Sequence, residues 1–363
     1  MKVSGRWRRA IELAGDGGSV IVLDQARLPY EIAWLSLTSV AEAARAIRNM
    51  HIRGAPLIGA TAAYGIALAM RADASDASLA AAHQQLGATR PTAVNLRWAL
   101  DAMQKRLATV APADRAQVAY AQAGKICDDD VAQCEAIGSH GLPLLRAAAE
   151  RAGDRPVRVL THCNAGWLAT VDWGTAIAPI YQAHEAGIRV HVWVDETRPR
   201  NQGMLTAWEL AQHGVPHTVV ADNQGGHLMQ RGLVDLCIVG TDRTTRNGDV
   251  ANKIGTYLKA LAAHDNHVPF YAAVPSPSID WTIGEPHEIP IEERDGDEVR
   301  YVRGVDASGA PARVAVVPAG SGVANAAFDV TPRRLVTGLI TERGVTPATR
   351  DGLYALFPEH AVP

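Results

Sequence analysis

Two residues at the ends of predicted strands have side chains suited to acid–base chemistry. Cys163 lies in VLTHCNAG, directly after an apolar run and before a predicted helix that begins near Trp167. The N–H groups at a helix N-terminus favour a thiolate and lower the pKa of a cysteine, and Gly166 lets a backbone approach a ligand. Asp242 ends the apolar run LVDLCIVGTD, and removal from water raises the pKa of such a carboxyl group. The pair therefore predicts a reactive thiolate and a general acid.

A structural role is the alternative for each of these residues. A cysteine at a strand end is often a buried packing residue, and this is our interpretation of Cys127, Cys134 and Cys237. Asp242 would then cap the following turn. A contact with Arg243 would lower the pKa of Asp242, although adjacent residues on an extended chain point to opposite faces.

Two other segments carry residues suited to phosphate binding. In HIRGAPLIG, Arg53 supplies a forked cation, Gly54 permits close backbone approach, and Pro56 suits the first turn of a helix whose positive end faces an anion. In NGDVANKIGTYLKAL, Asn252 and Lys253 lie at another predicted helix start. A helix cap with a surface ion pair is the alternative for each segment. Together the two segments indicate a phosphorylated ligand.

The elements that must position these residues fall into two halves of an α/β protein. Residues 1–35 alternate like the short strands of a small sheet, and from Ser39 to about Leu145 apolar residues recur at helical spacing. After the charged stretch RAAAERAGDRP, apolar strands alternate with helices, which predicts a parallel sheet covered on both faces. We therefore expect a mainly helical domain with a small β-sheet over residues 1–150 and an α/β domain over residues 151–363.

A parallel sheet also predicts where the functional site lies. In open α/β sheets, ligands bind outside the carboxyl ends of the strands. The stretches that follow predicted strands are residues 161–166, 195–203 and 241–253, and they contain Cys163, Asp242 and Lys253.

Composition excludes several classes of protein. The chain of 363 residues is 47% apolar and 20% charged, which excludes disorder as its main state. A net charge of -3 excludes nucleic-acid binding through overall charge. Residues 54–70 carry no charge but are fewer than the about 20 that a membrane span needs, so we expect a buried helix there.

Cysteine and histidine spacing argues against a metal site. The 4 cysteines form no CxxC pair, and the HxxxH spacing of His213 and His217 is interrupted by Gly214 and Pro216. We therefore expect no metal, no disulfide framework and a reducing, cytoplasmic location.

Seven motifs resemble the S-methyl-5-thioribose-1-phosphate isomerase family of methionine salvage. They run in order from about Val3 to Val345 and read VLDQARLP, IRGAPLIGATAAYG, TRPTAVNL, LTHCNAGWLAT, VWVDETRPRNQG, GTDRTTRNGDVANKIGTY and FDVTP. The same superfamily contains ribose-1,5-bisphosphate isomerases and non-catalytic regulatory subunits of the initiation-factor exchange complex. The resemblance implies a helical N-terminal domain with a small antiparallel sheet, a Rossmann-like C-terminal domain and a homodimer.

The resemblance also implies roles for individual residues. Cys163 matches the nucleophile or acid/base cysteine of the family, and Asp242 matches its proton donor. The substrate-binding residues of the family match Arg53, Gly54, Ala55, Arg90, Gln202, Asn252 and Lys253. Arg97 is the alternative to Arg90. One departure is Ala326 in NAAFDVTP, where the family has proline.

The implied reaction converts 5-methylthioribose 1-phosphate to 5-methylthioribulose 1-phosphate without a metal or an organic cofactor. Asp242 would protonate the ring oxygen, and hydrogen would move from C2 to C1 as a proton through Cys163 or as a hydride. The alternatives are an isomerase of 5-deoxyribose 1-phosphate or ribose 1,5-bisphosphate, or a non-catalytic regulatory binding subunit. The presence of both Cys163 and Asp242 favours an enzyme, and the apolar run around Tyr30 and Trp34 favours an uncharged C5 group. We expect neither a nucleic-acid nor a membrane partner.

Overall fold

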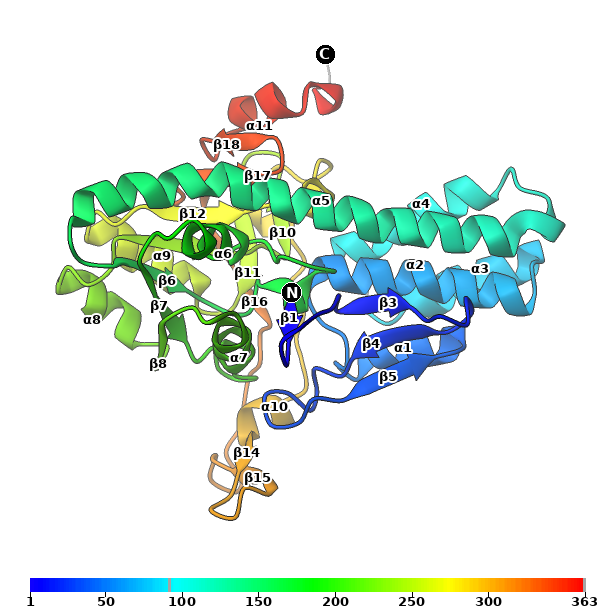
Figure 1. Ribbon diagram of the computed structural model, residues 1–363, viewed down its shortest axis with the longest axis horizontal. Coiled ribbons are helices and arrows are strands. Elements are labelled where there is room, and N and C mark those ends of the chain that lie inside the picture. The colour runs from blue at the N-terminus through cyan, green and yellow to red at the C-terminus, as the bar shows by residue number, and fades with distance from the viewer. Residues whose placement is uncertain (91–92, 362–363) are drawn as a thin grey trace.

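The computed structural model describes residues 1–90 and 93–361 and shows an α/β protein whose two halves are connected by one long helix (Figure 1). The N-terminal half is helical, as the apolar spacing predicts. Its helices are α1 (Val40–Arg48), α2 (Ala55–Ala72), α3 (Asp76–Gly87), α4 (Val94–Leu107) and α5 (Pro112–Ala152).

Helix α2 lies at the centre of this half and packs against α1, α4 and α5. By length and composition it would be able to cross a membrane, but 83% of it is buried inside the protein. Gly59 permits close packing, because a Cβ there would lie 2.9 Å from the carbonyl oxygen of Asn95 on α4. The uncharged stretch is therefore a core helix, as predicted.

The small sheet expected near the N-terminus is antiparallel and has the order β3-β4-β5. A separate hairpin precedes it. The strands are β1 (Lys2–Val3) and β2 (Arg6–Trp7) in the hairpin, and β3 (Ile11–Leu13), β4 (Val20–Leu23) and β5 (Trp34–Leu37) in the sheet.

The C-terminal half is built on a seven-stranded sheet with the order β18-β17-β12-β9-β6-β7-β8. All neighbouring strands are parallel except β17 and β18, which are antiparallel. This confirms the Rossmann-like architecture. The strands are β6 (Val157–Thr161), β7 (Val190–Asp195), β8 (His217–Val220), β9 (Leu236–Val239), β12 (Phe270–Ala273), β17 (Gly338–Thr341) and β18 (Gly344–Thr346).

Both faces of the sheet are covered because its side chains alternate between two apolar clusters. Val159 and Leu236 join the cluster that continues into α5, α6 and α7, whereas Leu160 and Cys237 join the cluster of α8 and α9. Cys237 is thus a packing residue, as interpreted. The helices of this half are α6 (Ala178–Glu185), α7 (Gly203–His213), α8 (Gln224–Gln230), α9 (Thr256–Asp265), α10 (Asp297–Arg300) and α11 (Arg350–Leu356), with 3₁₀ turns at η1 (Trp167–Ala169), η2 (Ser276–Ser278), η3 (Pro286–Glu288), η4 (Arg333–Leu335) and η5 (Pro358–His360).

A second sheet, with the order β13-β10-β11-β16, lies beside the carboxyl edge of the first and corrects one prediction. Asn252 and Lys253 were expected at a helix start, but they end strand β11, and α9 begins only at Thr256. The antiparallel pairing of β11 with both β10 and β16 fixes this extended conformation. The strands are β10 (Arg243–Thr245), β11 (Val250–Lys253), β13 (Ile279–Asp280) and β16 (Phe328–Thr331), and a hairpin of β14 (Tyr301–Val305) and β15 (Pro311–Ala315) projects from the same half.

The prediction of a helix that begins near Trp167 is also wrong. Only the three residues of η1 form a helical turn, and α6 begins at Ala178. An antiparallel bridge between Gly166 and Gly174 folds the intervening loop back on itself, so that the chain cannot continue as a helix.

Helix α5 crosses the boundary expected at residue 150. Its first part packs against α2 and α4, and its last part packs against α6, β6 and β17 (Figure 1). One apolar cluster contains residues of both halves. The division into domains at residues 1–150 and 151–363 therefore stays a prediction.

Candidate active site

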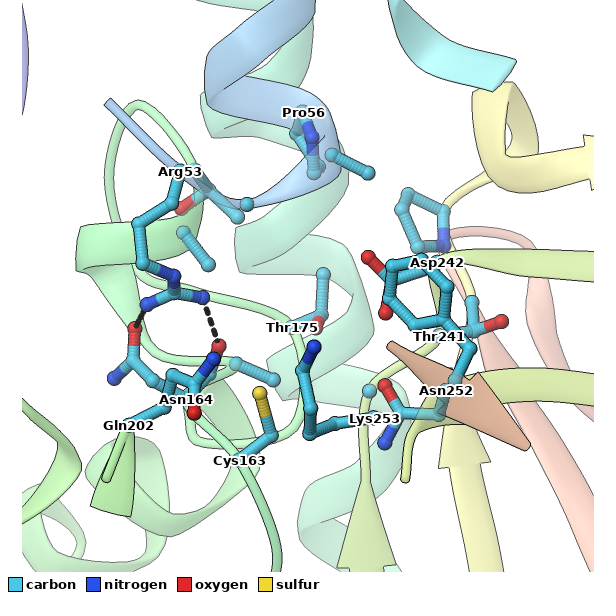
Figure 2. Close-up of a pocket in the computed structure, with 18 of the residues that line it drawn as sticks. Arg53, Pro56, Cys163, Asn164, Thr175, Gln202, Thr241, Asp242, Asn252 and Lys253 are labelled. Carbon is cyan, nitrogen blue, oxygen red and sulfur yellow. Dashed lines mark hydrogen bonds between the residues drawn. The ribbon is translucent and has the colours of Figure 1, made fainter. Parts of the chain in front are cut away.

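One pocket between the two halves brings together the residues singled out in the sequence (Figure 2). It lies between the start of α2, the end of β6 and the end of β11. Its lining includes Arg53, Gly54, Ala55, Arg90, Cys163, Gln202, Asp242, Asn252 and Lys253. The carboxyl edge of the main sheet thus forms one wall, as expected for an open α/β sheet.

The backbone of Cys163 is held in an uncommon conformation. Its φ of 71° lies in the left-handed region, which residues other than glycine rarely adopt. The Cys163 N–H donates to Oγ1 of Thr197 at 2.9 Å, and Oγ1 of Thr206 donates to the Cys163 carbonyl at 2.9 Å. Two hydroxyl groups thus fix the direction in which the thiol points, and such strain occurs often at functional sites.

The electrostatic surroundings of the Cys163 thiol differ from those expected. Burial raises the pKa of the thiol, while the nearby charges of Arg53 and Lys253 lower it. The three residues of η1 replace the full helix whose N-terminus was expected to act on the thiol. Two cationic side chains therefore take the place of the predicted helix as the groups that favour a thiolate.

Asp242 lies across the pocket from Cys163. Burial raises the pKa of its carboxyl group, and Lys253, Arg90 and Arg53 oppose the shift. The Arg243 guanidinium bonds to Oδ2 of Asp280 at 3.2 Å. Strand β10 begins with Arg243, so Asp242 lies in the bend just before the strand. The raised pKa is the property that a general acid requires near neutral pH.

Lys253 stands between the two acid–base residues. Its pKa is lowered by burial and raised by the charges of Cys163 and Asp242 (Figure 2). Its Nζ donates to the carbonyl of Ala327 at 2.8 Å and lies 4.6 Å from the centroid of the Phe328 ring. Strand pairing between β11 and β16 brings these partners under the lysine, so the ammonium group is fixed in place.

Arg53 is fixed by a chain of hydrogen bonds that begins on α7. Its guanidinium donates to both oxygens of Asn164, with the backbone contact at 2.7 Å (Figure 2). The Asn164 side-chain amide in turn donates to Oε1 of Glu209 at 2.7 Å. Burial raises the pKa of Glu209 to about 8. Sequence reasoning missed Glu209, whose only signal is a carboxylate on the apolar stretch LTAWELA.

The backbone before α2 approaches the loop after β6 very closely. Gly54 has a φ of 90°, and a Cβ on it would collide with the backbone of Ala169. Glycine is thus required there. Ala55 and Pro56 then begin α2 at the wall of the pocket, and the free N–H groups of this helix start favour an anion.

The structure also distinguishes the two candidate arginines of TRPTAVNL. Arg90 lines the pocket and donates to Oε2 of Glu292 at 2.8 Å, whereas Arg97 does not line the pocket and meets Arg90 only in a neighbouring depression. Within residues 1–90 and 93–361, Nε of Arg90 and Oε1 of Gln202 are buried without a hydrogen-bond partner. Since buried polar atoms are normally paired, these two are available to a ligand. Pro91 and Thr92 of the motif lie outside the described residues.

A larger cavity adjoins the pocket and shares Met50, Arg53 and Gln202 with it. Tyr30, expected near an uncharged C5 group, lines this cavity. Trp34 instead lies under the guanidinium of Arg8, 4.0 Å from the ring centroid. The cavity also has an unexpected set of cations, namely Arg48, Arg200, Arg294, Arg303 and Arg313.

Comparison with known proteins places this fold and pocket in a protein family. Residues 51–348 match the initiation factor 2 subunit family, and the chain belongs to that family. Among its relatives, the methylthioribose-1-phosphate isomerase of Rhodospirillum rubrum is 62% identical over 99% of this chain and 94% of the relative. The protein of the same name from Rhodospirillum centenum is 62% identical over 99% of this chain and 97% of the relative.

Two solved structures with different names are similar over nearly the whole chain. The 5-methylthioribose 1-phosphate isomerase from Pyrococcus horikoshii has a TM-score of 0.82 and 38% identity, covering 98% of this chain and 97% of the other. The translation initiation factor eIF-2B subunit delta from A. fulgidus has a TM-score of 0.79 and 36% identity, covering 97% and 100%. The fold therefore does not distinguish an enzyme from a binding subunit. That distinction depends on the residues of the site.

Proposed function

We propose that this protein is an aldose–ketose isomerase that converts 5-methylthioribose 1-phosphate to 5-methylthioribulose 1-phosphate in methionine salvage. The observation that carries the proposal is the placement of Cys163 and Asp242 on opposite sides of one cation-lined pocket. A subunit that only binds a partner has no need for a thiol and a carboxyl group with such surroundings. The 62% identity to relatives named for this reaction supports the choice of substrate.

Ring opening is the first chemical step. The anomeric oxygen of the substrate is esterified, so the furanose ring cannot open by the ordinary hemiacetal route. The Asp242 carboxyl group donates its proton to the ring oxygen as the bond between C1 and that oxygen breaks, which leaves a hydroxyl group on C4 and an oxocarbenium ion at C1 that keeps its phosphate. Burial favours the protonated acid before the step, and the cations around it stabilise the carboxylate after the step.

Hydrogen transfer from C2 to C1 is the second step. In the proton route the Cys163 thiolate removes the proton from C2 of the C1 cation, which gives an enediol phosphate. The thiol then returns a proton to C1, while the O2 hydroxyl group gives its proton to the Asp242 carboxylate and C2 becomes the ketone carbon. In the hydride route hydrogen passes directly from C2 to C1, and Cys163 accepts the proton of the O2 hydroxyl. Either route uses a thiolate whose charge is supported by Arg53 and Lys253.

The phosphate group anchors the sugar between these residues. Lys253, the Nε–H of Arg90, which has no partner among the described residues, and the N-terminus of α2 are the groups that bind it. Fixing C1 against both Cys163 and Asp242 supplies several kcal/mol of the barrier reduction through positioning.

Turnover of 5-methylthioribose 1-phosphate by the purified protein tests the proposal. Proton NMR should show loss of the anomeric signal and appearance of the ketose, with no change in mass. Binding of the sugar phosphate without any turnover would instead support the regulatory-subunit alternative and overturn the proposal.

The cytoplasmic location and the homodimer expected from the sequence belong to the same proposal. The four cysteines are free and buried, which suits a reducing compartment. The homodimer rests on the family resemblance, and light scattering of the purified chain tests it.

Replacing Lys253 by alanine is expected to raise KM about tenfold or more and also to lower kcat, because the ammonium group binds the phosphate and also supports the Cys163 thiolate. A phosphate cation acts in the ground state and the transition state alike, and a hydrogen bond to a charged group contributes about 1.5–3 kcal/mol. Steady-state kinetics measures the effect. Lys125→Ala is the control, because Lys125 is exposed and pairs with Asp129. A large fall in kcat at unchanged KM would contradict the phosphate-binding role.

Dialysis against a chelator is expected to leave kcat/KM unchanged. The acid, the base and the phosphate-binding groups of the proposal are all side chains or backbone groups of this chain, so no step needs a metal ion. Elemental analysis and assay before and after dialysis measure the result. Activity restored only by a divalent ion would show that the mechanism is incomplete.

A further inference from the structure

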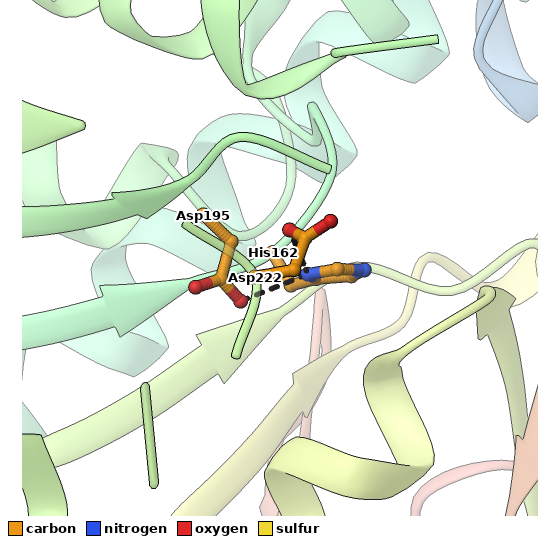
Figure 3. Close-up of side chains that lie close together, drawn as sticks. All are labelled: His162, Asp195 and Asp222. Carbon is orange, nitrogen blue, oxygen red and sulfur yellow. Dashed lines mark hydrogen bonds and ion pairs between the residues drawn. The ribbon is translucent and has the colours of Figure 1, made fainter. Parts of the chain in front are cut away.

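A group of three ionisable residues, His162, Asp195 and Asp222, lies close together at the carboxyl ends of β6, β7 and β8 (Figure 3). It contains His162, which precedes Cys163 in the chain and is 1% exposed. Nδ1 of His162 lies 2.9 Å from Oδ2 of Asp195, and its Nε2 lies 2.8 Å from the carbonyl oxygen of Ile254. The imidazole does not line the pocket, and the proposed mechanism gives it no role.

The group resembles a metal site at first sight but already holds a cation. Ligand atoms of His162, Asp195 and Asp222 lie within 4.8 Å of one another. However, Nζ of Lys259 lies 3.2 Å from Oδ2 of Asp195 and also donates to the backbone oxygen of Asp222. A divalent ion at this place would meet the ammonium group as a like charge, so we interpret the group as an internal ion cluster.

The carboxylate of Asp222 is also committed to the chain. Its Oδ1 accepts from the N–H of Thr197 at 2.7 Å, and its Oδ2 accepts from the N–H of Arg198 at 2.7 Å. Thr197 is the residue whose hydroxyl accepts from the N–H of Cys163. The cluster is thus connected by short bonds to the backbone that carries the thiol.

The hydrogen bond between His162 and Ile254 has a defined direction. A carbonyl oxygen only accepts hydrogen bonds, so Nε2 of His162 must carry a proton. This holds whether the ring is neutral or charged, because Nδ1 faces a carboxyl group that can accept or donate. Gly255, with a φ of 101°, leaves room for the ring, since a Cβ there would lie 3.1 Å from two ring atoms.

This bond connects the two sides of the pocket. His162 is adjacent to Cys163 at the end of β6, and Ile254 is adjacent to Lys253 at the end of β11. The thiol and the ammonium group that lies beside it are therefore each one residue away from the same hydrogen bond. A change in that bond alters the separation of the two functional groups.

We propose that His162 is a positioning residue of the isomerase, which fixes Cys163 relative to Lys253 through its Nε2–H bond to the carbonyl of Ile254. The inference rests on the proposed function, because Lys253 anchors the phosphate while Cys163 acts at C2. An error of about 1 Å in such a distance lowers the rate of the chemical step by as much as about a hundredfold. The binding cations themselves remain, so the effect falls on kcat more than on KM.

Two substitutions separate the bond to Ile254 from the contact with Asp195. His162→Gln places an amide N–H near the position of Nε2 and keeps the bond to Ile254, whereas His162→Asn places its amide near Nδ1 and loses that bond. We expect His162→Asn to lower kcat at least about tenfold with KM within about threefold of the parent, and His162→Gln to keep kcat within about threefold. His191→Asn is the control, because His191 on β7 packs against Trp193 away from the pocket.

A second measurement does not depend on the substrate. The rate at which iodoacetamide alkylates Cys163 is followed against pH without sugar, with peptide mapping to identify the modified cysteine. His162→Asn should move the midpoint of this profile to higher pH, because the ammonium group of Lys253 is no longer held beside the thiolate. His162→Gln should match the parent.

The outcomes discriminate between the proposals. Equal kcat and equal alkylation profiles in the Asn and Gln variants would overturn the positioning role, as would a rise in KM at parental kcat. If melting curves show that His162→Asn does not fold, a loss of more than about tenfold in kcat by folded His162→Gln overturns the role. A parent that alkylates as expected but turns over no sugar would refute the proposed function and leave the alkylation comparison to decide the role of His162.

Discussion

Replacing Cys163 by serine, or Asp242 by asparagine, is expected to lower kcat at least about a hundredfold while the fold persists. Both changes keep the size of the side chain. A serine hydroxyl is a far weaker acid than a thiol and does not ionise in this pocket, and an asparagine amide cannot supply a proton to the ring oxygen. A hundredfold loss corresponds to about 2.7 kcal/mol of activation free energy, within the range of positioned acid–base groups.

Circular dichroism and melting curves of both variants should remain near those of the parent. Cys237→Ser is the matched control, because Cys237 is fully buried in the sheet and lines no part of the pocket. It is expected to lower the melting temperature but to keep the kcat of the folded protein. If Cys163→Ser or Asp242→Asn turns over at a near-parental rate, the role given to that residue is wrong.

The group at C5 is expected to produce the second large effect. We expect kcat/KM for the 5-methylthio and 5-deoxy sugars to exceed that for ribose 1,5-bisphosphate by at least about a hundredfold, equivalent to roughly 3 kcal/mol. The larger cavity beside the pocket does contain arginines, but two of them, Arg200 and Arg294, already share an anionic partner in Glu298. Oε1 of Glu298 lies 2.6 Å from Nη2 of Arg294 and 2.9 Å from Nη1 of Arg200.

Glu298 gives this discrimination its physical basis. The two arginines lower the pKa of its carboxyl group to about 2, so it stays charged near neutral pH. A second phosphate would compete with Glu298 for the same guanidinium groups, and any charge left unpaired is costly to bury. Glu298→Gln should narrow the preference, because it releases Arg200 for an anion and leaves Arg294 with its other contact, to Oε1 of Glu292 at 2.8 Å.

Parallel assays with the three sugars, differing only at C5, measure the ratio. Arg313→Ala is a suitable control, since Arg313 is half exposed and pairs with exposed Asp297 at the rim. Equal or better turnover of the bisphosphate by the parent would place this chain with the ribose-1,5-bisphosphate isomerases.

The main sheet and the residues at its edge were predictable because their signals are local. Each of its central strands is a short apolar run, and Cys163 and Asp242 follow such runs directly. The parallel arrangement then requires that strand ends meet at one edge. Knowledge of the strands alone was thus sufficient to place the two acid–base candidates in one region.

The second sheet was not predictable in this way. Strand β11 pairs with β16, with Asn252 opposite Asp329 and Lys253 opposite Phe328. This pairing joins segments about 75 residues apart, and neither segment shows a long apolar alternation. The partners that hold Lys253 in place therefore follow from tertiary contacts, which a local pattern does not contain.

The contacts between buried polar side chains were also not predictable from the sequence. Glu209 lies on an apolar helix, and its role depends on Asn164, which is distant in the sequence. The arginines of the larger cavity come from helix α1, from the loop before α7, from the segment before α10 and from the hairpin. A sequence does not show which charged residues form ion pairs. The pairing of Glu298 with both Arg200 and Arg294 is therefore seen only in the structure.

Helix α5 determines whether either half of the chain can fold alone. Its 41 residues bury apolar side chains in one core that both halves share. Fragments made by cutting the chain near residue 150 would each expose a broad apolar surface and would aggregate rather than fold.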